Sequence, residues 1–370
     1  FHLGAMACII SALASSLISA APLISILKVA GLAMLFLYGA TGARASFRRD
    51  PEKFIRVLLI GCEIVVFVSA FVYLALKIPI FGNPNSLGAI MAFIEPLLLW
   101  DVLVNPSKTG RHRRIAALCF SGLLLYTSVA RAAILGAAVA TVVLCTILRR
   151  HRMLSKVALV SILLVSLAGV LEPARFSNFV DSVTGSFLYK NNEQSGILGS
   201  RLSPWSKASE TIQKHPFFGS GFGTRTWLSV GDVSQLQLSR SIHDFEYGSS
   251  YVSIVDYTGI VGAGMFGLLL FLLIQRIWQV CRFVWRSRDF SYQAIPFVMI
   301  VIVGVIHAGF EDWMFAAGSY ICVFFWPCAF LLMDMVPPRT QRSVLNPFLR
   351  RQVSLHPGFA SVQPRGLQTR

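Results

Sequence analysis

The sequence predicts an all-α integral membrane protein with about ten transmembrane helices and one large loop outside the cytoplasm. Only 14% of its residues are charged, whereas a soluble domain carries roughly 25%. Long uncharged stretches cause this deficit, and several approach the roughly 20 residues that a helix needs to cross a bilayer. These stretches lack the apolar–polar alternation of barrel strands. Because every backbone amide in hydrocarbon needs an internal partner, we expect helices.

Ten apolar runs are the candidate membrane helices, and prolines such as Pro22, Pro79 and Pro337 mark several of their edges. The runs cover residues 5–20, 22–41, 57–78, 87–104, 115–129, 132–148, 157–171, 250–275, 294–310 and 318–336. The first residues, FHLGAMACII, already have the composition of a membrane-helix edge, without the charged start of a signal peptide. We therefore expect a fragment that lacks N-terminal helices.

Lysine and arginine in the connecting segments predict the orientation of the helices. Alternate connections hold 23 of the 33 basic residues, and they lie in 44–56, 105–114, 149–156, 276–288 and the C-terminal tail. The intervening connections are poor in them, and 79–86 and 307–317 hold none. By the positive-inside rule the basic connections are cytoplasmic. Anionic lipid accounts for the net charge of +16, so no nucleic-acid partner is expected.

This topology predicts four regions. Residues 1–172 form an N-terminal membrane bundle, residues 173–249 a large extracytoplasmic loop, residues 250–337 the C-terminal membrane helices, and residues 338–370 a basic cytoplasmic tail. Within the loop, SPWSKASETIQKH predicts a short amphipathic helix with Ser203 as its N-cap. The glycines of GSGFG then end that helix in a tight turn. They lack the preceding buried strand of a dinucleotide-binding loop.

Two arginines of the non-cytoplasmic side are candidate anion ligands. Arg131 lies between two apolar runs with almost no loop, where a charge costs a few kcal/mol unless it reaches the interface or binds a partner. Arg201 precedes the amphipathic helix. A guanidinium has forked donors that match phosphate, whereas the structural alternatives are an interfacial anchor for Arg131 and an ordinary loop residue for Arg201.

His243 stands where the outer loop re-enters the membrane, and histidine can act as a general base near neutral pH. Asp244 and Glu246 follow it, and Glu311 precedes the last apolar run. A His-x-x-Glu metal pair is conceivable, but no further histidine or cysteine completes it nearby. We therefore expect no metal. The seven cysteines lie mostly in apolar runs, contain no CxxC pair, and are expected to be buried.

Four segments in this order resemble the O-antigen ligase and polysaccharide polymerase superfamily. They are FGNPNSLGAIMAF, TSVARAAIL, SRLSPWSKASETIQKHPFFGSGFG and HDFEYGSSYVSIVDYTGIVG, and the resemblance covers roughly residues 80–320. Asp244 departs from the asparagine expected after the histidine, which leaves the subfamily open.

The resemblance implies a metal-independent glycosyltransferase without a cofactor, in the bacterial cytoplasmic membrane with its active site on the periplasmic face. The donor would be a glycan on undecaprenyl pyrophosphate and the acceptor a glycan or lipid, with other polysaccharide-assembly membrane proteins as further partners. In this interpretation Arg131 and Arg201 bind the pyrophosphate, and His243 is the catalytic base with Glu246 beside it. Asp244, Arg225 and Glu311 are supporting candidates.

Polymerase and ligase share this donor, and the long outer loop favours a polymerase of exopolysaccharide or O-antigen repeats. The alternative is a ligase that transfers the glycan to lipid A core. A transporter or lipid-glycan flippase would show internal repeats and a polar path at the membrane midplane, and neither is visible. A non-catalytic scaffold would tolerate loss of Arg131, Arg201 and His243.

Overall fold

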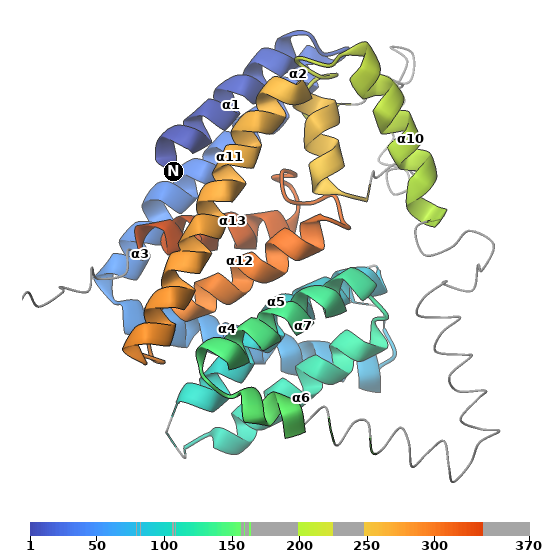
Figure 1. The fold of residues 1–370 in the computed structure, drawn as a ribbon. Coiled ribbons are helices and arrows are strands. Elements are labelled where there is room, and N and C mark those ends of the chain that lie inside the picture. The colour runs from blue at the N-terminus through green and yellow to red at the C-terminus, as the bar shows by residue number, and fades with distance from the viewer. Residues whose placement is uncertain are drawn as a thin grey trace, which may run out of the picture. The chain divides into compact units, whose positions relative to one another are not determined.

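The computed structural model describes residues 1–78, 80–81, 83–105, 107, 109–156, 159, 163, 199–224 and 248–335. Within these residues every regular element is a helix (Figure 1). Residues Phe1–Met335 form one compact unit. The predicted all-helical class is therefore confirmed for the described part of the chain.

Helices begin at proline and at polar caps. Pro22, Pro51 and Pro84 each stand in the first turn of a helix, where a missing N–H removes no helical hydrogen bond. Asp50 and Asn83 cap two of these helices by accepting backbone N–H donors at 2.9 Å. The elements are α1 (His2–Leu17), α2 (Pro22–Tyr38), η1 (Gly39–Ala43), α3 (Arg44–Arg49), α4 (Pro51–Ala70), η2 (Phe71–Ala75), α5 (Pro84–Val104), α6 (Arg111–Thr127), α7 (Arg131–Ile147), α10 (Gly199–Lys214), α11 (Ser250–Ser287), α12 (Ala294–Ala308) and α13 (Tyr320–Asp334).

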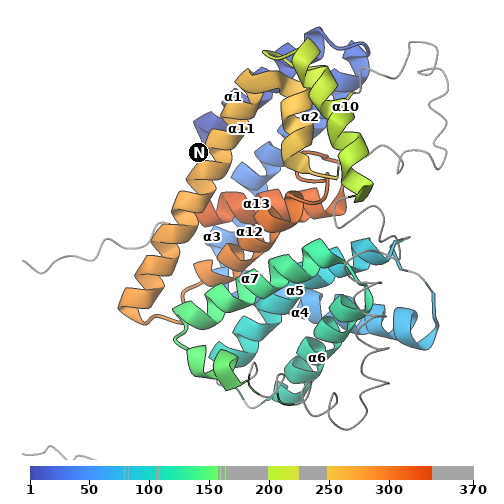
Figure 2. The same ribbon diagram turned by 45° about the vertical axis from the view of Figure 1, so that its right-hand side comes forward.

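Helix α11 consists of two arms. As a straight rod its 38 residues would extend about 57 Å, nearly twice the thickness of the hydrocarbon core. Gly259 has φ 62° and ψ −170°, which breaks the helix. The short arm, residues 250–258, and the long arm, residues 260–287, diverge from this point in both views (Figures 1 and 2). The predicted span 250–275 thus lies in α11, which is broken at Gly259.

Helix α12 forms the centre of the described bundle, because 13 of its 15 residues are buried. In both ribbon views it lies between α13 and the α5–α7 pair. Helices α1, α2, α4 and the long arm of α11 carry large apolar side chains on their outer faces; Leu3 is 81% exposed and Met34 71%. A soluble protein rarely exposes such continuous apolar faces. These faces are therefore suited to lipid contact.

Three ion pairs lie near the ends of the helices that the basic-residue count predicts to be cytoplasmic. Arg44 contacts Asp334 at 2.7 Å, Arg113 contacts Glu63 at 2.8 Å, and Arg114 contacts Asp101 at 3.6 Å. Glu63, Asp101 and Asp334 are thus paired. Each pair joins two helices, so these charges tie the bundle together.

Nine of the ten predicted runs correspond to helices of the described residues, while the run 157–171 lies almost wholly outside them. Four helical segments have the length and composition to cross a membrane: residues 22–49, 51–75, 84–104 and 250–287. Four other apolar helices have 15 to 17 residues. The protein is therefore a helical membrane protein, and the number of spans stays a prediction. Two predicted loops, 44–56 and 276–288, are largely helical.

Candidate functional site

The segment that links α10 to α11 docks into the break in α11. Helix α10 ends at Lys214, and Gly219, Gly221 and Gly223 then adopt positive φ angles of 72°, 111° and 67°. A Cβ atom on Gly219 would lie 2.5 Å from the carbonyl oxygen of Asp256, and one on Gly259 would lie 2.3 Å from the carbonyl carbon of Phe217. The two backbones meet at a distance that only glycine permits on both sides.

The break exposes backbone groups of α11 that the docked loop satisfies. The N–H groups of Ser220 and Gly221 donate to the carbonyls of Asp256 and Tyr257 at 2.8 and 3.1 Å. In return, Ile260 N–H donates to the carbonyl of Pro216 at 2.8 Å. Buried backbone groups need such partners. The loop 216–221 therefore replaces the helical hydrogen bonds that Gly259 interrupts.

The turn between α1 and α2 holds the other side of this loop with serines. Ser25 Oγ donates to the carbonyl of Phe222 at 2.8 Å, and Ser19 Oγ lies 2.5 Å from Thr224 Oγ1. Ser15 Oγ donates to the carbonyl of Tyr257, and Lys28 Nζ to the carbonyl of Gly223. The loop is thus fixed between α1, α2 and α11 (Figure 1).

The connection between α12 and α13 is joined to the start of α11 through Ser250. The N–H and hydroxyl of Ser250 both donate to the carbonyl oxygen of Glu311, at 3.2 and 2.8 Å. Its hydroxyl oxygen accepts from the N–H groups of Trp313 and Met314 at 3.1 and 3.0 Å. The buried Trp313 indole donates to His307 Nδ1 at 2.8 Å. Four hydrogen bonds therefore place the Glu311 segment beside the first turn of α11.

Arg131 opens α7 after a tight turn in which Val129 has φ 52°. This turn lies against α5, because a Cβ on Gly88 would meet Ser128 Oγ at 2.3 Å. Further along α7, a Cβ on Gly136 would lie 3.3 Å from the carbonyl oxygen of Val303 in α12. Arg131 precedes this crossing by five residues, about 7.5 Å of helix. The half-buried Arg131 therefore lies in the first turn of α7, next to the α6–α7 turn.

We call these connected segments the loop cluster: the α1–α2 turn, the loop 215–224, the short arm of α11, the α12–α13 connection and the α6–α7 turn. The loop 215–224, the α6–α7 turn and the α12–α13 connection belong to connections that the basic-residue count predicts to be outside the cytoplasm. Of the predicted site residues, the cluster contains Arg131 and Glu311. Arg201 lies in α10, of which only the backbone is described at that position. Arg225, His243, Asp244 and Glu246 lie outside the described residues.

Helix α10 begins at Gly199, so the prediction of Ser203 as its N-cap is wrong, and Pro204 stands inside the helix. The predicted apolar face is present: Ala208 is fully buried, and Trp205 and Ile212 are partly buried. This face contacts α11. Helix α10 thus packs on α11, the helix that is broken at Gly259.

Sequence analysis missed the residues that hold the loop cluster together. The signal was present as ASSLISAAPLISILK, where serines and Lys28 interrupt two apolar runs. Asp256 is fully buried, and Ser220 Oγ lies 3.3 Å from its Oδ2. Among the described residues, no three His, Cys, Asp or Glu side chains form a metal-binding group.

A scan of protein families matches residues 115–267 to the family described as O-antigen ligase. This segment of the chain is similar to O-antigen ligases. The predicted superfamily is thereby confirmed, and the match supports a membrane glycosyltransferase of the ligase or polymerase type. No curated protein matches the chain.

The matched segment includes most of α6, all of α7 and α10, the docked loop and the break in α11. The remaining parts of the loop cluster come from both sides of the matched segment: the serine-rich turn from residues 15–25, and the Glu311 connection from residues 309–319. The two arginines predicted to bind pyrophosphate lie on different helices of the matched segment, Arg131 on α7 and Arg201 on α10. Helices outside the matched segment thus complete its loop cluster.

Proposed function

We propose that the protein transfers a glycan from undecaprenyl pyrophosphate to an acceptor hydroxyl on the periplasmic face of the bacterial cytoplasmic membrane, and that it polymerises polysaccharide repeat units. The observation that carries the proposal is the O-antigen ligase match over residues 115–267, which contains Arg131, Arg201 and His243. No nucleotide sugar is available outside the cytoplasm. A lipid pyrophosphate is therefore the leaving group.

In the proposed reaction, the bond between the anomeric carbon and the pyrophosphate oxygen breaks, and the acceptor oxygen bonds to that carbon. His243 takes the acceptor proton. Undecaprenyl pyrophosphate leaves with the bonding electrons, and Arg131 and Arg201 stabilise its charge. Glu246 or Asp244 orients the imidazole. Because arginines balance the charge, the reaction requires no metal.

The α12–α13 connection supports a role for Glu311. Its carbonyl is bound by Ser250, which stands seven residues after His243 in the sequence. Carboxylates at this place would suit hydroxyl recognition on the incoming sugar. Arg225 directly follows the docked loop that ends at Thr224 and is a further candidate ligand of the pyrophosphate.

A ligase is the second candidate function, and the description of the matched family favours it. The length of the predicted outer loop, residues 173–249, favours the polymerase, because a polymerase holds two glycan chains. The two differ only in the acceptor.

The test is a purified protein in liposomes with undecaprenyl-pyrophosphate-linked repeat units, a chelator and no nucleotide sugar. A ladder of longer lipid-linked glycans supports the polymerase. Product that forms only when lipid A core is added supports the ligase. Transfer of intact donor across the bilayer, without any new glycosidic bond, would exclude both and indicate a flippase.

A further inference from the structure

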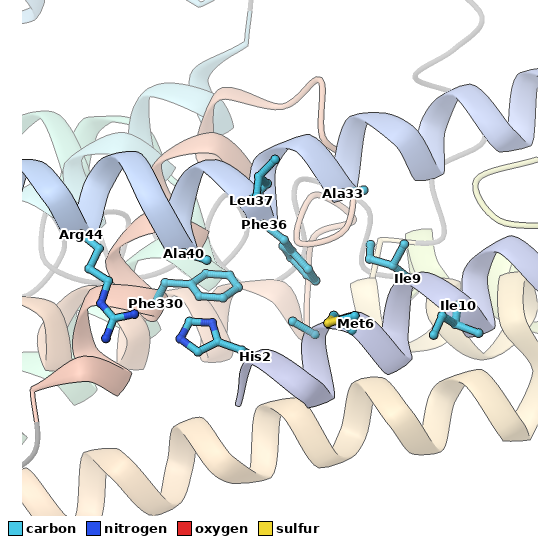
Figure 3. Close-up of a pocket in the computed structure, with 11 residues that line it drawn as sticks. His2, Met6, Ile9, Ile10, Ala33, Phe36, Leu37, Ala40, Arg44 and Phe330 are labelled. Atoms are coloured by element: carbon cyan, nitrogen blue, oxygen red, sulfur yellow. The ribbon is translucent and has the colours of Figure 1, made fainter.

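An apolar groove lies between α1, α2 and α13, on the lipid-suited face of the bundle (Figure 3). Its volume is about 520 Å³, within the roughly 300–1,000 Å³ of sites that hold small molecules. Met6, Ile9, Ala33, Phe36, Ala40 and Phe330 are among its lining residues. The groove is separate from the loop cluster, and the proposed reaction does not use it.

Small residues create the hollow. Ala33 on α2 and Ala40 in η1, about two turns further along, leave the space that larger side chains would fill. Phe36 and Phe330 meet edge to face, with ring centroids 5.6 Å apart, and form a firm wall. The groove is therefore a preformed channel for a slender apolar group.

One end of the groove is polar and basic. Arg44 and His2 line it, and both approach Asp334: Arg44 Nε at 2.7 Å and His2 Nε2 at 3.9 Å. His2 also stacks on Phe330, with centroids 5.5 Å apart. Arg48 is exposed one helical turn beyond Arg44. Arg44 and His2 thus share a single carboxylate, and the exposed Arg48 adds a further positive charge, so the entrance favours an anion.

We propose that this groove binds an anionic phospholipid, with one acyl chain along α2 and the phosphate at Arg44, Arg48 and His2. An acyl chain gains little by leaving other chains for an apolar groove, because both surroundings are equally apolar. The headgroup therefore decides which lipid is retained. The positive-inside count assigns this end to the cytoplasmic leaflet, where anionic lipids are concentrated.

The experiment places the full chain in nanodiscs that contain equal amounts of phosphatidylglycerol and phosphatidylcholine with identical acyl chains. After release into mild detergent, native mass spectrometry counts the retained lipids. We expect one phosphatidylglycerol in preference to phosphatidylcholine. Equal retention of the two lipids would overturn the proposal.

Two variants separate the headgroup from the groove. Arg44→Gln with Asp334→Asn removes both partners of the ion pair and leaves no buried lone charge. Relative to Asp334→Asn alone, this double variant loses one cation, so its retention should be lower by roughly fivefold, the effect of one cation at an anionic membrane surface. Ala33→Phe fills the groove and keeps every charge, and should also abolish retention. Arg152→Gln changes an exposed arginine five residues beyond α7; it is the matched control and should retain the lipid.

Asp334→Asn alone should increase lipid retention, a result that misfolding cannot produce. It frees Arg44 from its carboxylate, so phosphatidylglycerol should be retained more strongly. Weaker retention in this variant would contradict the proposal. A photo-reactive residue at position 33 identifies the occupant directly: cross-linking to lipid supports the proposal, and cross-linking to another protein segment overturns it.

Discussion

Gly259 shows how much of this fold depends on single atoms. A methyl group there would lie 2.3 Å from the backbone of Phe217, and its φ of 62° disfavours any L side chain. We expect Gly259→Ala to displace the docked loop, lowering activity strongly and stability by about 1–3 kcal/mol. Glycan synthesis and thermal unfolding in detergent measure the two effects.

Gly264→Ala is the matched control, since it lies five residues further along α11 with no atom within 4 Å of the added carbon. Alanine favours helix over glycine by roughly 1 kcal/mol, so this variant should remain active and at least as stable. If the two variants behaved alike, the close approach at Gly259 would have no importance for the protein.

His243 is the residue on which the proposed chemistry depends most. A positioned base contributes about 10²–10⁴-fold to the rate, so His243→Ala should lose turnover by this factor while lipid-linked donor still binds. Glu246→Gln should be milder, because it removes only an orienting group. If His243→Ala bound donor poorly but turned over normally at saturation, the histidine would be a phosphate ligand instead.

Substitution of Arg131 and Arg201 tests binding of the donor pyrophosphate, whereas substitution of His243 tests proton transfer. Lysine keeps the charge but lacks the forked donors that bind phosphate through two hydrogen bonds. Arg131→Lys and Arg201→Lys should therefore each raise the donor concentration needed for half-maximal activity. Lys214→Arg, at the exposed end of α10, is a control for substitution on that side of the chain. Full activity in both lysine variants would remove the arginine pair from the mechanism.

At the scale of elements, the docking of the 215–224 loop on the α1–α2 turn can be trapped. Ser19 Oγ lies 2.5 Å from Thr224 Oγ1, so cysteines at both positions should form a disulfide on mild oxidation in a cysteine-free background. A shift in gel mobility after proteolysis between them reports the bond. Ser19→Cys with Lys207→Cys, on an exposed position of α10, should stay reduced.

The sequence predicts those features of the helices that neighbouring residues determine. Proline in the first turn and caps such as Asp50 set helix starts, and apolar length sets helix extent. In DYTGIVGAG three glycines weaken the helix, but nothing local indicates that α11 breaks at Gly259 and continues through Gly262 and Gly264. The cause of the break is a loop some 40 residues earlier that supplies the missing hydrogen bonds. Likewise, nothing in the sequence distinguishes Ser250 from other serines, although it makes four hydrogen bonds to Glu311, Trp313 and Met314.

In the candidate site too, some residues could be predicted from the sequence, whereas others depend on partners far along the chain. Arg131 was identifiable because a charge in an apolar run is conspicuous, and Glu311 because a polar pair separates two apolar runs. Ser25 and Lys28 carry equally visible signals, but their role depends on a partner about 200 residues away. The distance between two sequence motifs cannot be calculated from their spacing along the chain, since packing of other helices sets it.

At the scale of the whole molecule, the orientation of the bundle gives the final prediction. The count of basic residues predicts that residues 105–114 lie in the cytoplasm and α10 outside. The loop 215–224, the α6–α7 turn and the α12–α13 connection belong to the connections that are predicted to lie outside. In a cysteine-free background, a membrane-impermeant maleimide applied to intact cells should label Lys214→Cys and spare His112→Cys. Both positions are exposed in the fold, so burial cannot cause the difference. Permeabilised cells should show both labelled. The reverse pattern would place the loop cluster in the cytoplasm, where nucleotide sugars are available, and the argument for a lipid pyrophosphate donor would fail.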